Sequence, residues 1–516
     1  SGSTRQASDS TQRVLVLKRL EDARRDGDRV YAVIKGAGAS FGDSEAALVK
    51  SFSRAWNDAQ ADPATLGLLE AHASGAPRQD RREAAACAQY FSAGLPCALT
   101  GVKNAVGHAG AAASLAATVR AALALYHEVI PPLSPLNPID ELRPASRRLH
   151  APVRPQHWLR NKADGPRRAA VTALGLDGNC AHLVLEQCQG QDTPRAAAER
   201  ARPLGERAEA LFSAHGTPQE LKRLQAWAAD QDAALSMEAL AGLWLRQAAP
   251  AYKNPVVLAA RSKQELAELA KSAARWLDEN PQKPLFTDKI SWSAGAAFKP
   301  DEIAFVFPGS GNHYIGMGAA LGLLWPEVMR GLDAENSRLS DQFVPERFLP
   351  RRLDWKTGWL DEAERELNMD FHAMIFGTVS CASAYSDLLR ACGLEPRYAL
   401  GYSLGETAGL FALRAWAGRD EMLSRMKGSS LFVSDLAGPC EAVRRFWNLP
   451  KEERMDWVLG VIDRPADSVH MALKGMEKAA LLIVNAPFEC VIGGYKKAVD
   501  SLVSGLGCVF LPLQGV

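Results

Sequence analysis

Residues 401–405 read Gly-Tyr-Ser-Leu-Gly, and this spacing is suited to nucleophilic catalysis by a serine. A Gly-x-Ser-x-Gly sequence between a strand and a helix holds the serine on a tight, strained turn. The two glycines allow neighbouring backbone to approach where a Cβ would clash. The helix that is predicted to begin at Leu404 directs its free N–H groups at the serine. We therefore expect Ser403 to attack a thioester carbonyl and to become acylated.

A negative oxygen forms during such an attack, and backbone N–H groups from two separate loops stabilise it. Leu404 supplies one N–H, because it opens the helix behind the serine. The second donor is predicted to be the N–H of Ser310, in the Pro-Gly-Ser-Gly loop at 308–311, where Gly309 is expected to contact the substrate. Each such donor contributes about 3 kcal/mol of transition-state stabilisation.

Residues 301–516 are predicted to form the α/β body that positions these groups. The expected elements are strands at 302–307 and 397–402 and helices at 326–339 and 360–392. The first strand ends at the Pro-Gly-Ser-Gly loop and the second ends at the serine. Residues 455–514 then follow in the order strand–helix–strand–strand–helix–strand, which is typical of a ferredoxin-like subdomain.

Two further blocks precede this body. In residues 1–190, short β-branched runs alternate with helical stretches, which favours an α/β layered domain. Its strands are expected at 13–17, 30–35, 67–71, 97–101, 169–174 and 181–186, and its helices at 43–58, 81–91 and 109–126. Residues 191–300 are predicted to be an α-rich linker, with amphipathic helices at 218–229, 237–247 and 262–280 and a single strand at 255–258. This linker is either an adaptor between the flanking blocks or a solvated spacer.

The composition narrows the class of protein. A chain of 516 residues is too long for one core, and 60 Lys+Arg against 59 Asp+Glu leave almost no net charge. That balance argues against nucleic acid and anionic membranes as partners. The chain lacks an apolar run long enough for a membrane span and a hydrophobic signal core at its start. Nine scattered cysteines indicate reduced thiols rather than a zinc site, so we expect a cytoplasmic protein without a bound metal.

The Phe-Pro-Gly-Ser-Gly loop at 307–311, the Gly-Tyr-Ser-Leu-Gly-Glu segment at 401–406 and the ferredoxin-like segment together resemble the malonyl/acyl-carrier transacylase family over residues 301–516. The resemblance implies an α/β-hydrolase-like acyltransferase that works through an acyl-serine intermediate. This family places a histidine at 402, where the chain has Tyr402, and a glutamine at 310, where it has Ser310. It also carries an arginine at the position of Gly428, which pairs with the free carboxylate of malonyl substrates.

Two consequences of these departures remain open. Arg425, one helical turn before Gly428, either replaces the missing substrate-binding arginine or is a solvated helix charge. The general base of the family is a histidine after the last strand of the subdomain, so we expect it beyond Val516. His313 and His470 are interpreted as structural or solvated histidines rather than as a replacement base.

Residues 13–190 resemble the carboxyl-terminal, thiolase-like half of a β-ketoacyl synthase. The matching stretches are 14–23, 70–77, 102–112, 129–132 and 176–182. Condensation needs two neutral imidazoles, which drive decarboxylation and bind the developing enolate oxygen. The resemblance implies that His72 and His108 are these imidazoles and that Lys103 is the supporting cation. His182 is expected on the closing strand, near the floor of the site.

The nucleophilic cysteine of a ketosynthase is absent from its expected place. Only 71 residues precede His72 and none of them is a cysteine, whereas Cys87 and Cys97 come too late and are expected to be buried. The family pattern His-Gly-Thr-Gly-Thr is also degraded to His-Ala-Ser-Gly-Ala at 72–76. A half-domain of this kind exposes an apolar face. Three explanations of the missing half stay open. The sequence is a fragment, or internal segments are missing from it, or a second polypeptide supplies the partner half in trans.

The order ketosynthase half, linker and acyltransferase resembles modular polyketide synthases, and the two serine-site motifs resemble the acyltransferase-bearing subunit of bacterial polyunsaturated fatty acid synthases. The resemblance implies transfer of acyl groups between thioesters of CoA and acyl carrier protein, in either direction. The implied partners are acyl-CoA, acyl carrier protein with its phosphopantetheine arm, and a second copy of the chain bound through the ketosynthase-like part. It implies no intrinsically bound cofactor.

Two other functions are compatible with the sequence. The chain could be a non-catalytic scaffold that docks carrier proteins, which the degraded motif favours and the intact serine segment opposes. It could instead be a serine hydrolase or thioesterase, which would need an acid–histidine pair after the serine, and no such pair is visible. The sequence leaves open the acyl-chain length and whether the substrate has a free carboxylate.

Overall fold

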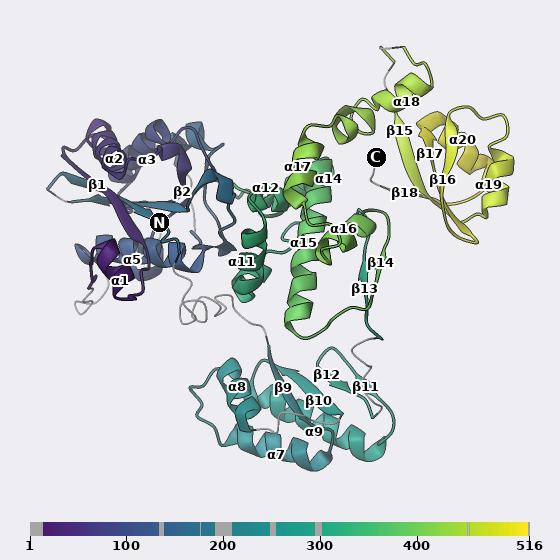
Figure 1. Cartoon of the computed structure of the whole chain (residues 1–516), viewed down its shortest axis with the longest axis horizontal. Helices are drawn as coiled ribbons and strands as arrows, with labels where there is room; N and C mark the ends of the chain where they lie inside the picture. The colour runs from purple at the N-terminus through teal and green to yellow at the C-terminus, as the bar shows by residue number, and fades with distance from the viewer. Residues whose placement is uncertain are drawn as a thin grey trace. The chain divides into compact units, whose positions relative to one another are not determined.

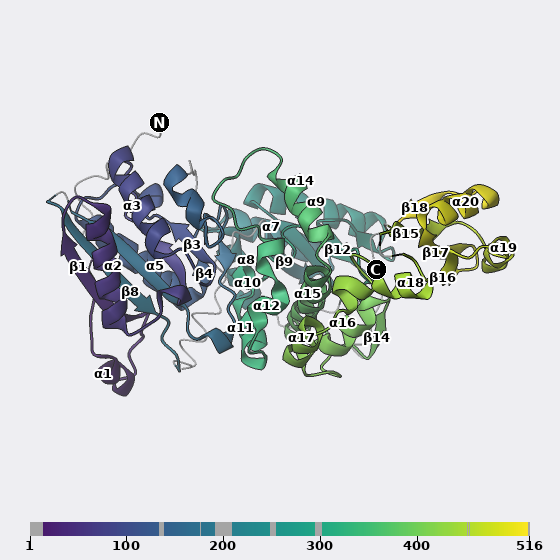
Figure 2. The same cartoon turned by 90° about the horizontal axis from the view of Figure 1, so that it is seen from above.

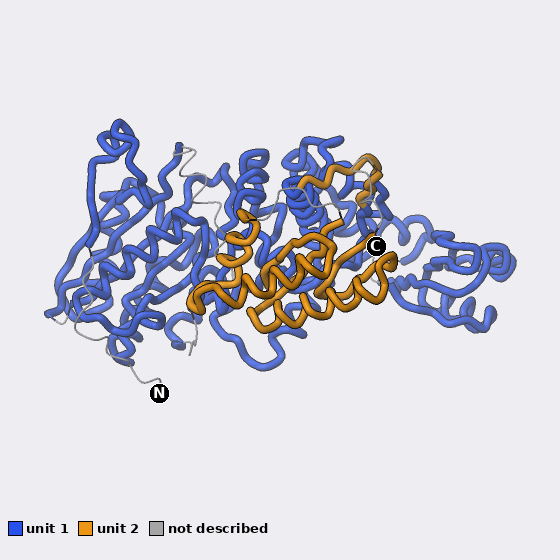
Figure 3. The backbone as a smooth tube through the Cα atoms, turned by 90° about the horizontal axis from the view of Figure 1, so that it is seen from below, with its two compact units in different colours: residues 1–203, 306–392, 399–516 blue, residues 204–305, 393–398 orange. Residues whose placement is uncertain are grey.

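The computed structural model describes residues 14–133, 139–175, 177–190, 209–247, 254–294, 302–450, 452–453 and 455–513. The chain divides into two compact units, which Figure 3 shows in blue and orange. The first consists of residues 1–203, 306–392 and 399–516, and the second of residues 204–305 and 393–398. The boundaries that the sequence predicts near 190 and 300 fall at the edges of stretches outside the described residues. Among the described helices, none is both long and apolar enough to cross a bilayer.

A mixed six-stranded sheet forms the amino-terminal part of the first unit (Figures 1 and 2). Its order is β1-β8-β7-β2-β3-β5, with bounds Val33–Phe41 (β1), Asn179–Glu186 (β8), Arg168–Leu174 (β7), Leu66–Glu70 (β2), Cys97–Thr100 (β3) and Leu149–His150 (β5). The helices α2 (Glu45–Ala59) and α3 (Pro77–Tyr90) share one core with this sheet, and α5 (Ala112–His127) shares a second core on the other face.

Parallel pairing in this sheet determines where the histidine site lies. The strands β2 and β3 are parallel neighbours, with Glu70 opposite Thr100. Their carboxyl ends therefore lie at the same edge, so that the segment after β2 and the short helix α4 (Lys103–Val106) after β3 come together. The strand predicted at 13–17 is wrong in its described part, because residues 14–17 are exposed, have no strand partner and precede the helix α1 (Leu20–Arg25).

The second unit is not the mainly helical linker that the sequence predicts. The predicted helices are present as α7 (Pro218–Ala229), α8 (Met237–Gln247) and α9 (Lys263–Glu279). They pack on a four-stranded sheet of order β11-β12-β10-β9, with bounds Leu285–Phe286, Ile290–Trp292, Pro255–Ala260 and Ala210–His215. Three of these strands are missed, because short strands gain their stability from pairing partners that are distant in the sequence.

Helices dominate the region from 302 to 450. Its strands β13 (Ala304–Phe307) and β14 (Tyr398–Gly401) form a two-stranded sheet. The helices are α10 (Leu321–Leu324), α11 (Pro326–Glu335), α12 (Leu339–Phe343), α13 (Pro345–Phe348), α14 (Trp359–Asn368), α15 (Phe371–Ala391), α16 (Leu404–Ala412), α17 (Arg419–Lys427) and α18 (Glu441–Phe446). The helix predicted at 360–392 is two helices, because Asp370 caps α15 by accepting a hydrogen bond from the N–H of Ala373 (2.9 Å). The larger sheet of an α/β-hydrolase body is not seen in these described residues.

Residues 457–512 form the βαββαβ arrangement. The elements are β15 (Trp457–Ile462), α19 (Ala466–Ala472), β16 (Ala479–Ala486), β17 (Glu489–Tyr495), α20 (Lys496–Leu506) and β18 (Phe510–Pro512). The sheet order is β16-β17-β15-β18, which is the split βαβ topology. Both helices pack on one face of the sheet, around Ile462, Cys490 and Ile492.

Candidate acyl-serine and histidine sites

Ser403 lies at the sharp corner between β14 and α16. Its backbone angles are φ 51° and ψ −116°, a region that residues other than glycine rarely occupy. The side chain is exposed, and α16 begins at the next residue. A strained, exposed serine at the amino end of a helix is the geometry that the sequence motif requires.

Two glycines make this corner possible. A Cβ on Gly401 would lie 2.5 Å from the Cα of Glu406, and a Cβ on Gly405 would overlap the carbonyl oxygen of Phe307 and lie 2.8 Å from its carbonyl carbon. Real Cβ atoms do not approach backbone this closely. The end of β13 therefore packs directly on the first turn of α16.

The loop at 308–311 contacts the corner from the other side. A Cβ on Gly309 would lie 2.9 Å from the ring of Tyr402 and 3.0 Å from its carbonyl oxygen, and the N–H of Tyr402 donates to the oxygen of Phe307 (3.2 Å). Leu404 is the first residue of α16, where an N–H has no intrahelical acceptor. Ser310, exposed in this loop, and Leu404 thus lie on the two segments that meet at the serine, and their roles as oxyanion donors stay predictions.

The other predicted groups of this site lie apart from Ser403. The ring of His313 is held by Asn368 through Nε2 (2.8 Å to Oδ1), and His470 is exposed on α19. Within the described part of the chain, no hydrogen bond joins either histidine to the serine. Arg425 pairs with Glu421 one helical turn away (2.6 Å), with 80% of its side chain exposed.

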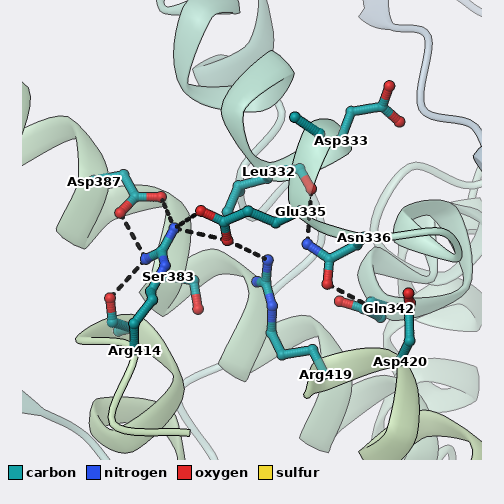
Figure 4. A network of polar contacts seen from close by, with 12 residues as sticks. Leu332, Asp333, Glu335, Asn336, Gln342, Ser383, Asp387, Arg414, Arg419 and Asp420 are labelled. Atoms are coloured by element: carbon teal, nitrogen blue, oxygen red, sulfur yellow. Dashed lines mark hydrogen bonds and ion pairs between the residues drawn. The ribbon is translucent and has the colours of Figure 1, made fainter. Parts of the chain in front are cut away.

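The helix that carries the serine is anchored by a cluster of arginines and carboxylates (Figure 4). Arg414, just after α16, donates to both carboxylate oxygens of Asp387 on α15 (2.7 Å each) and to Glu335 on α11 (3.0 Å). Arg419 is buried beside Glu335 (3.8 Å), and this burial lowers its pKa to about 10. The cluster joins α11, α15 and the end of α16, and the sequence gives no local signal for it, because its members are distant along the chain.

His72 and His108 form a second candidate site, at the carboxyl ends of β2 and β3. Their ring centroids are 6.1 Å apart, with the ring planes nearly perpendicular. The Nδ1 atom of His72 accepts from the N–H of Leu174 (3.2 Å), and Nδ1 of His108 accepts from the N–H of Gly110 (3.2 Å). A neutral imidazole that accepts at Nδ1 carries its proton on Nε2. Both rings therefore have an N–H group with which to bind an oxygen of a substrate.

The surroundings keep His72 uncharged. Burial, with Lys103 and His108 nearby, lowers the pKa of His72 to about 3. The ammonium of Lys103 donates to the backbone oxygen of His72, and burial lowers the pKa of Lys103 to about 8. The carboxylate of Glu83 accepts from the N–H groups of His72 (2.7 Å) and Ala73 (2.9 Å) and thereby fixes the turn that carries the ring.

Glu70 is a positioning residue that the sequence analysis misses. It is fully buried at the end of β2, where its carboxylate accepts from the hydroxyl of Thr100 (2.7 Å) and from the N–H of Val102, with Arg120 at 3.6 Å. These contacts fix the turn that leads into Lys103. A glutamate at the end of an otherwise apolar strand, Leu-Gly-Leu-Leu-Glu, was the available signal.

No thiol suited to attack belongs to the described part of the histidine site. Cys87 and Cys97 are buried as predicted, and burial raises the pKa of both, for Cys97 to about 12. The pKa of Cys180 is also raised by burial. A nucleophilic cysteine needs the opposite shift.

His182, on β8, is buried against the hydroxyl of Thr172 (3.2 Å), away from solvent. The described residues contain no cluster of three or more His, Cys, Asp or Glu side chains placed to hold a metal ion.

Comparison with known proteins matches the histidine part to a family. Residues 31–137 match the model of the beta-ketoacyl synthase C-terminal domain. Over 513 residues the chain is 28% identical to a mycocerosic acid synthase-like polyketide synthase of Mycobacterium tuberculosis (strain ATCC 25618 / H37Rv), covering 95% of this chain and 22% of that protein. It is 26% identical over 468 residues to a polyunsaturated fatty acid synthase of Thraustochytrium sp., covering 79% of this chain and 16% of that protein.

These similarities concern parts of much longer proteins. Polyketide synthase GfsA of Streptomyces halstedii is 28% identical over 513 residues, which are 96% of this chain and only 6% of GfsA. Among solved structures, the ketosynthase from module 6 of the bacillaene synthase from Bacillus subtilis 168 is similar with 23% identity and a TM-score of 0.31, over 50% of this chain and 46% of that one. A structural similarity at this TM-score does not establish the fold of the matched part of this chain.

Proposed function

We propose that this chain, which contains a ketosynthase region of the kind found in polyketide and polyunsaturated fatty acid synthases, transfers acyl groups between thioesters through Ser403. The observation that carries the proposal is the backbone of Ser403, at φ 51° and ψ −116°. Such a conformation costs roughly 1–3 kcal/mol and persists only where the surroundings impose it. We infer a chemical role from this strain together with the exposure of the side chain.

The reaction has two halves. The Oγ atom of Ser403 attacks the thioester carbonyl, the C–S bond breaks, and the hydroxyl proton passes through a general base to the leaving thiolate. During the attack, the N–H groups of Leu404 and Ser310 stabilise the oxyanion. In the second half, the thiol of a phosphopantetheine arm attacks the acyl-serine ester and restores the hydroxyl. Acyl-CoA and acyl carrier protein are the proposed donor and acceptor, and either direction is chemically allowed.

We also propose that the acyl group is apolar, because a partly exposed apolar sheet face lies near the serine. The hydroxyl of Tyr402 bonds to Asn485 on β16 (2.9 Å), which joins the serine corner to the subdomain. Across the sheet from there, one row of paired residues is entirely aliphatic. Its members, in the order β16-β17-β15-β18, are Ile483, Val491, Val461 and Leu511.

This row lies on the face of the sheet that α19 and α20 do not cover. Side chains alternate along a strand, and Cys490 and Ile492, the neighbours of Val491, belong to the core under those helices. On the open face, Leu482 packs over Gly493 beside Trp457. Ile483 and Leu511 at the two ends of the row are 41% and 60% exposed and Leu482 is 42% exposed, whereas Val491 between them is buried. An aliphatic acyl chain would cover this surface. We propose further that Arg425, which is exposed and bound to Glu421, is a solvated helix charge rather than a partner for a substrate carboxylate.

For the histidine site, we propose that the two Nε2–H groups of His72 and His108 bind a thioester or enolate oxygen. Condensation then requires a cysteine thiolate from another polypeptide segment, because the cysteines near this site are buried thiols. A homodimer through this part of the chain is proposed separately, from the match of residues 31–137 to a ketosynthase domain. The alternative is a non-catalytic scaffold in which both sites only bind carrier-protein arms.

Mass spectrometry of the chain after incubation with hexanoyl-CoA tests the acyltransferase proposal. We expect a hexanoyl adduct on the peptide that contains Ser403, which a pantetheine thiol removes. The S403A variant should lose the adduct, whereas S424A, at an exposed serine of α17, should keep it. No adduct in a chain that continues past Val516 and includes the expected general base favours the scaffold. Rapid release of free hexanoate without a thiol acceptor favours a hydrolase.

A further inference from the structure

A polar cavity of about 250 Å³ lies in the first unit, apart from both candidate sites. Its walls come from β5, from β6 (Gln156–His157) and the loop after it, and from residues 340–351. The polar side chains that matter here are His150, His157, Arg160 and Arg351.

Among the described lining residues, the buried side-chain atoms without a hydrogen-bond partner are all nitrogens, whereas Asp333, the ion-pair partner of Arg160, leaves Oδ1 without one. His150 is 3% exposed, and neither ring nitrogen makes a hydrogen bond of good geometry, although the backbone of Arg148 and Cys97 lies close enough to raise its pKa. His157 is 9% exposed and leaves Nδ1 without a partner, and Arg160 leaves Nε and Nη1 without one. Buried polar groups are nearly always hydrogen-bonded, so several such atoms around one cavity indicate that something fills it.

The carboxylates of the cavity wall are already engaged. Asp164 binds Arg338 (2.8 Å), Asp341 binds Lys427 (2.6 Å), and Glu346 lies 3.4 Å from Arg351. No carboxylate of the described wall is therefore left for the free N–H groups of Arg160, whose Nη2 alone is paired, with Asp333 (3.1 Å).

We infer that this cavity binds a small oxyanion, with phosphate as the chemical class, through Arg160 and His150. Water is the simpler occupant, but each water brings as many donors as acceptors, whereas Arg160 offers only donors. A phosphate ion brings a negative charge and mostly acceptor oxygens. Burial and the nearby Arg351 lower the pKa of His150 to about 3, against the opposing effect of the Arg148 and Cys97 backbone. A bound anion would favour the charged ring, which donates from both nitrogens. The phosphate is either free or the terminal phosphate of a larger molecule such as CoA.

Thermal unfolding and calorimetry of the whole chain test the inference. With inorganic phosphate as the probe, at ionic strength matched with chloride, we expect a saturable rise of several degrees in Tm at about 100 times the Kd. The R160M variant should weaken phosphate binding at least tenfold. The R275M variant, which changes an exposed arginine on α9, should bind phosphate as the unmodified chain does.

Two outcomes contradict the inference. No phosphate-dependent rise means that the cavity holds water only, and an equal rise in R160M means that phosphate binds elsewhere. If R160M fails to fold, H150Q serves instead, because it keeps the volume and one donor but cannot become charged, and it should also weaken binding. CoA and dephospho-CoA form the second arm. Tighter binding of CoA than of dephospho-CoA identifies a ligand-borne phosphate, and equal, weak binding of both identifies free phosphate.

Discussion

Replacing Gly405 by alanine gives the sharpest test of the serine corner. The added Cβ would overlap the carbonyl oxygen of Phe307 and lie 2.8 Å from its carbonyl carbon, and main-chain atoms cannot turn away as a flexible side chain can. The backbone of Gly405 itself is helical, so the substitution adds contact without adding torsional strain. The only way to relieve the overlap is to move β13 away from α16.

The expected cost combines two opposing effects. Overpacking of this kind destabilises a protein by about 1–3 kcal/mol. Exchange of glycine for alanine inside a helix returns up to about 1 kcal/mol. The net change in the free energy of unfolding should therefore be small to moderate. The effect on transfer should be larger, because a displacement of about 1 Å at a reacting group costs about a hundredfold in rate.

The assay measures both quantities on the same protein. Urea unfolding followed by fluorescence gives stability, and the rate of hexanoyl-adduct formation at Ser403 gives reactivity. Gly331 in α11 is the matched control, since a Cβ there meets no atom within 4 Å and G331A should be neutral or stabilising with an unchanged rate. A G405A variant that forms the adduct as fast as the unmodified chain would refute the close packing of β13 on α16 as the support of the serine.

Three further predictions concern His72, Ile483 and Arg414. Because the folded pKa of His72 is about 3 and the unfolded value is near 6.5, the unfolded state binds more protons between these pH values. The free energy of unfolding should fall as the pH drops through this window. The H72F variant should reduce the pH dependence of that free energy by the equivalent of about one proton. The I483K variant should slow adduct formation from hexanoyl-CoA more than from acetyl-CoA, and equal slowing would contradict an acyl chain on that face. The R414Q variant should lower the free energy of unfolding by about 1–3 kcal/mol, because it loses the hydrogen bonds to Asp387 and Glu335. In the same urea titrations, the exposed control R425Q should change this free energy by less than about 0.5 kcal/mol.

The sequence predicts features that depend on neighbours along the chain. The strand–serine–helix corner at 401–405 is such a feature, because its glycines and the start of the helix lie within one short segment. The βαββαβ order at 457–512 is another, since each element has its own hydrophobic period and turn. The helices α7, α8 and α9 of the second unit are predicted for the same reason.

The sequence predictions are wrong where the structure depends on segments that are distant along the chain. Residues 14–17 have the sequence pattern of a strand but pair with no other strand. The segments of β9, β11 and β12 have no clear strand pattern, yet β9 and β12 pair with β10, and β11 pairs with β12. The break between α14 and α15 depends on one capping side chain, Asp370, inside a long helical pattern. Boundaries and short strands are therefore the elements that the pattern of residues specifies least.

The order of residues is enough to identify the types of chemistry that the chain can carry: a serine at a strained corner, and two histidines and a lysine that follow strand ends. How these groups are supported depends on the folded chain. Glu70 and Glu83 hold the histidine turns, Tyr402 reaches Asn485, and the cavity around His150 and Arg160 is enclosed by segments that are distant in the sequence. The physical reason is that hydrogen bonds and burial depend on distance in space, and a linear sequence specifies that distance only across a few neighbouring residues.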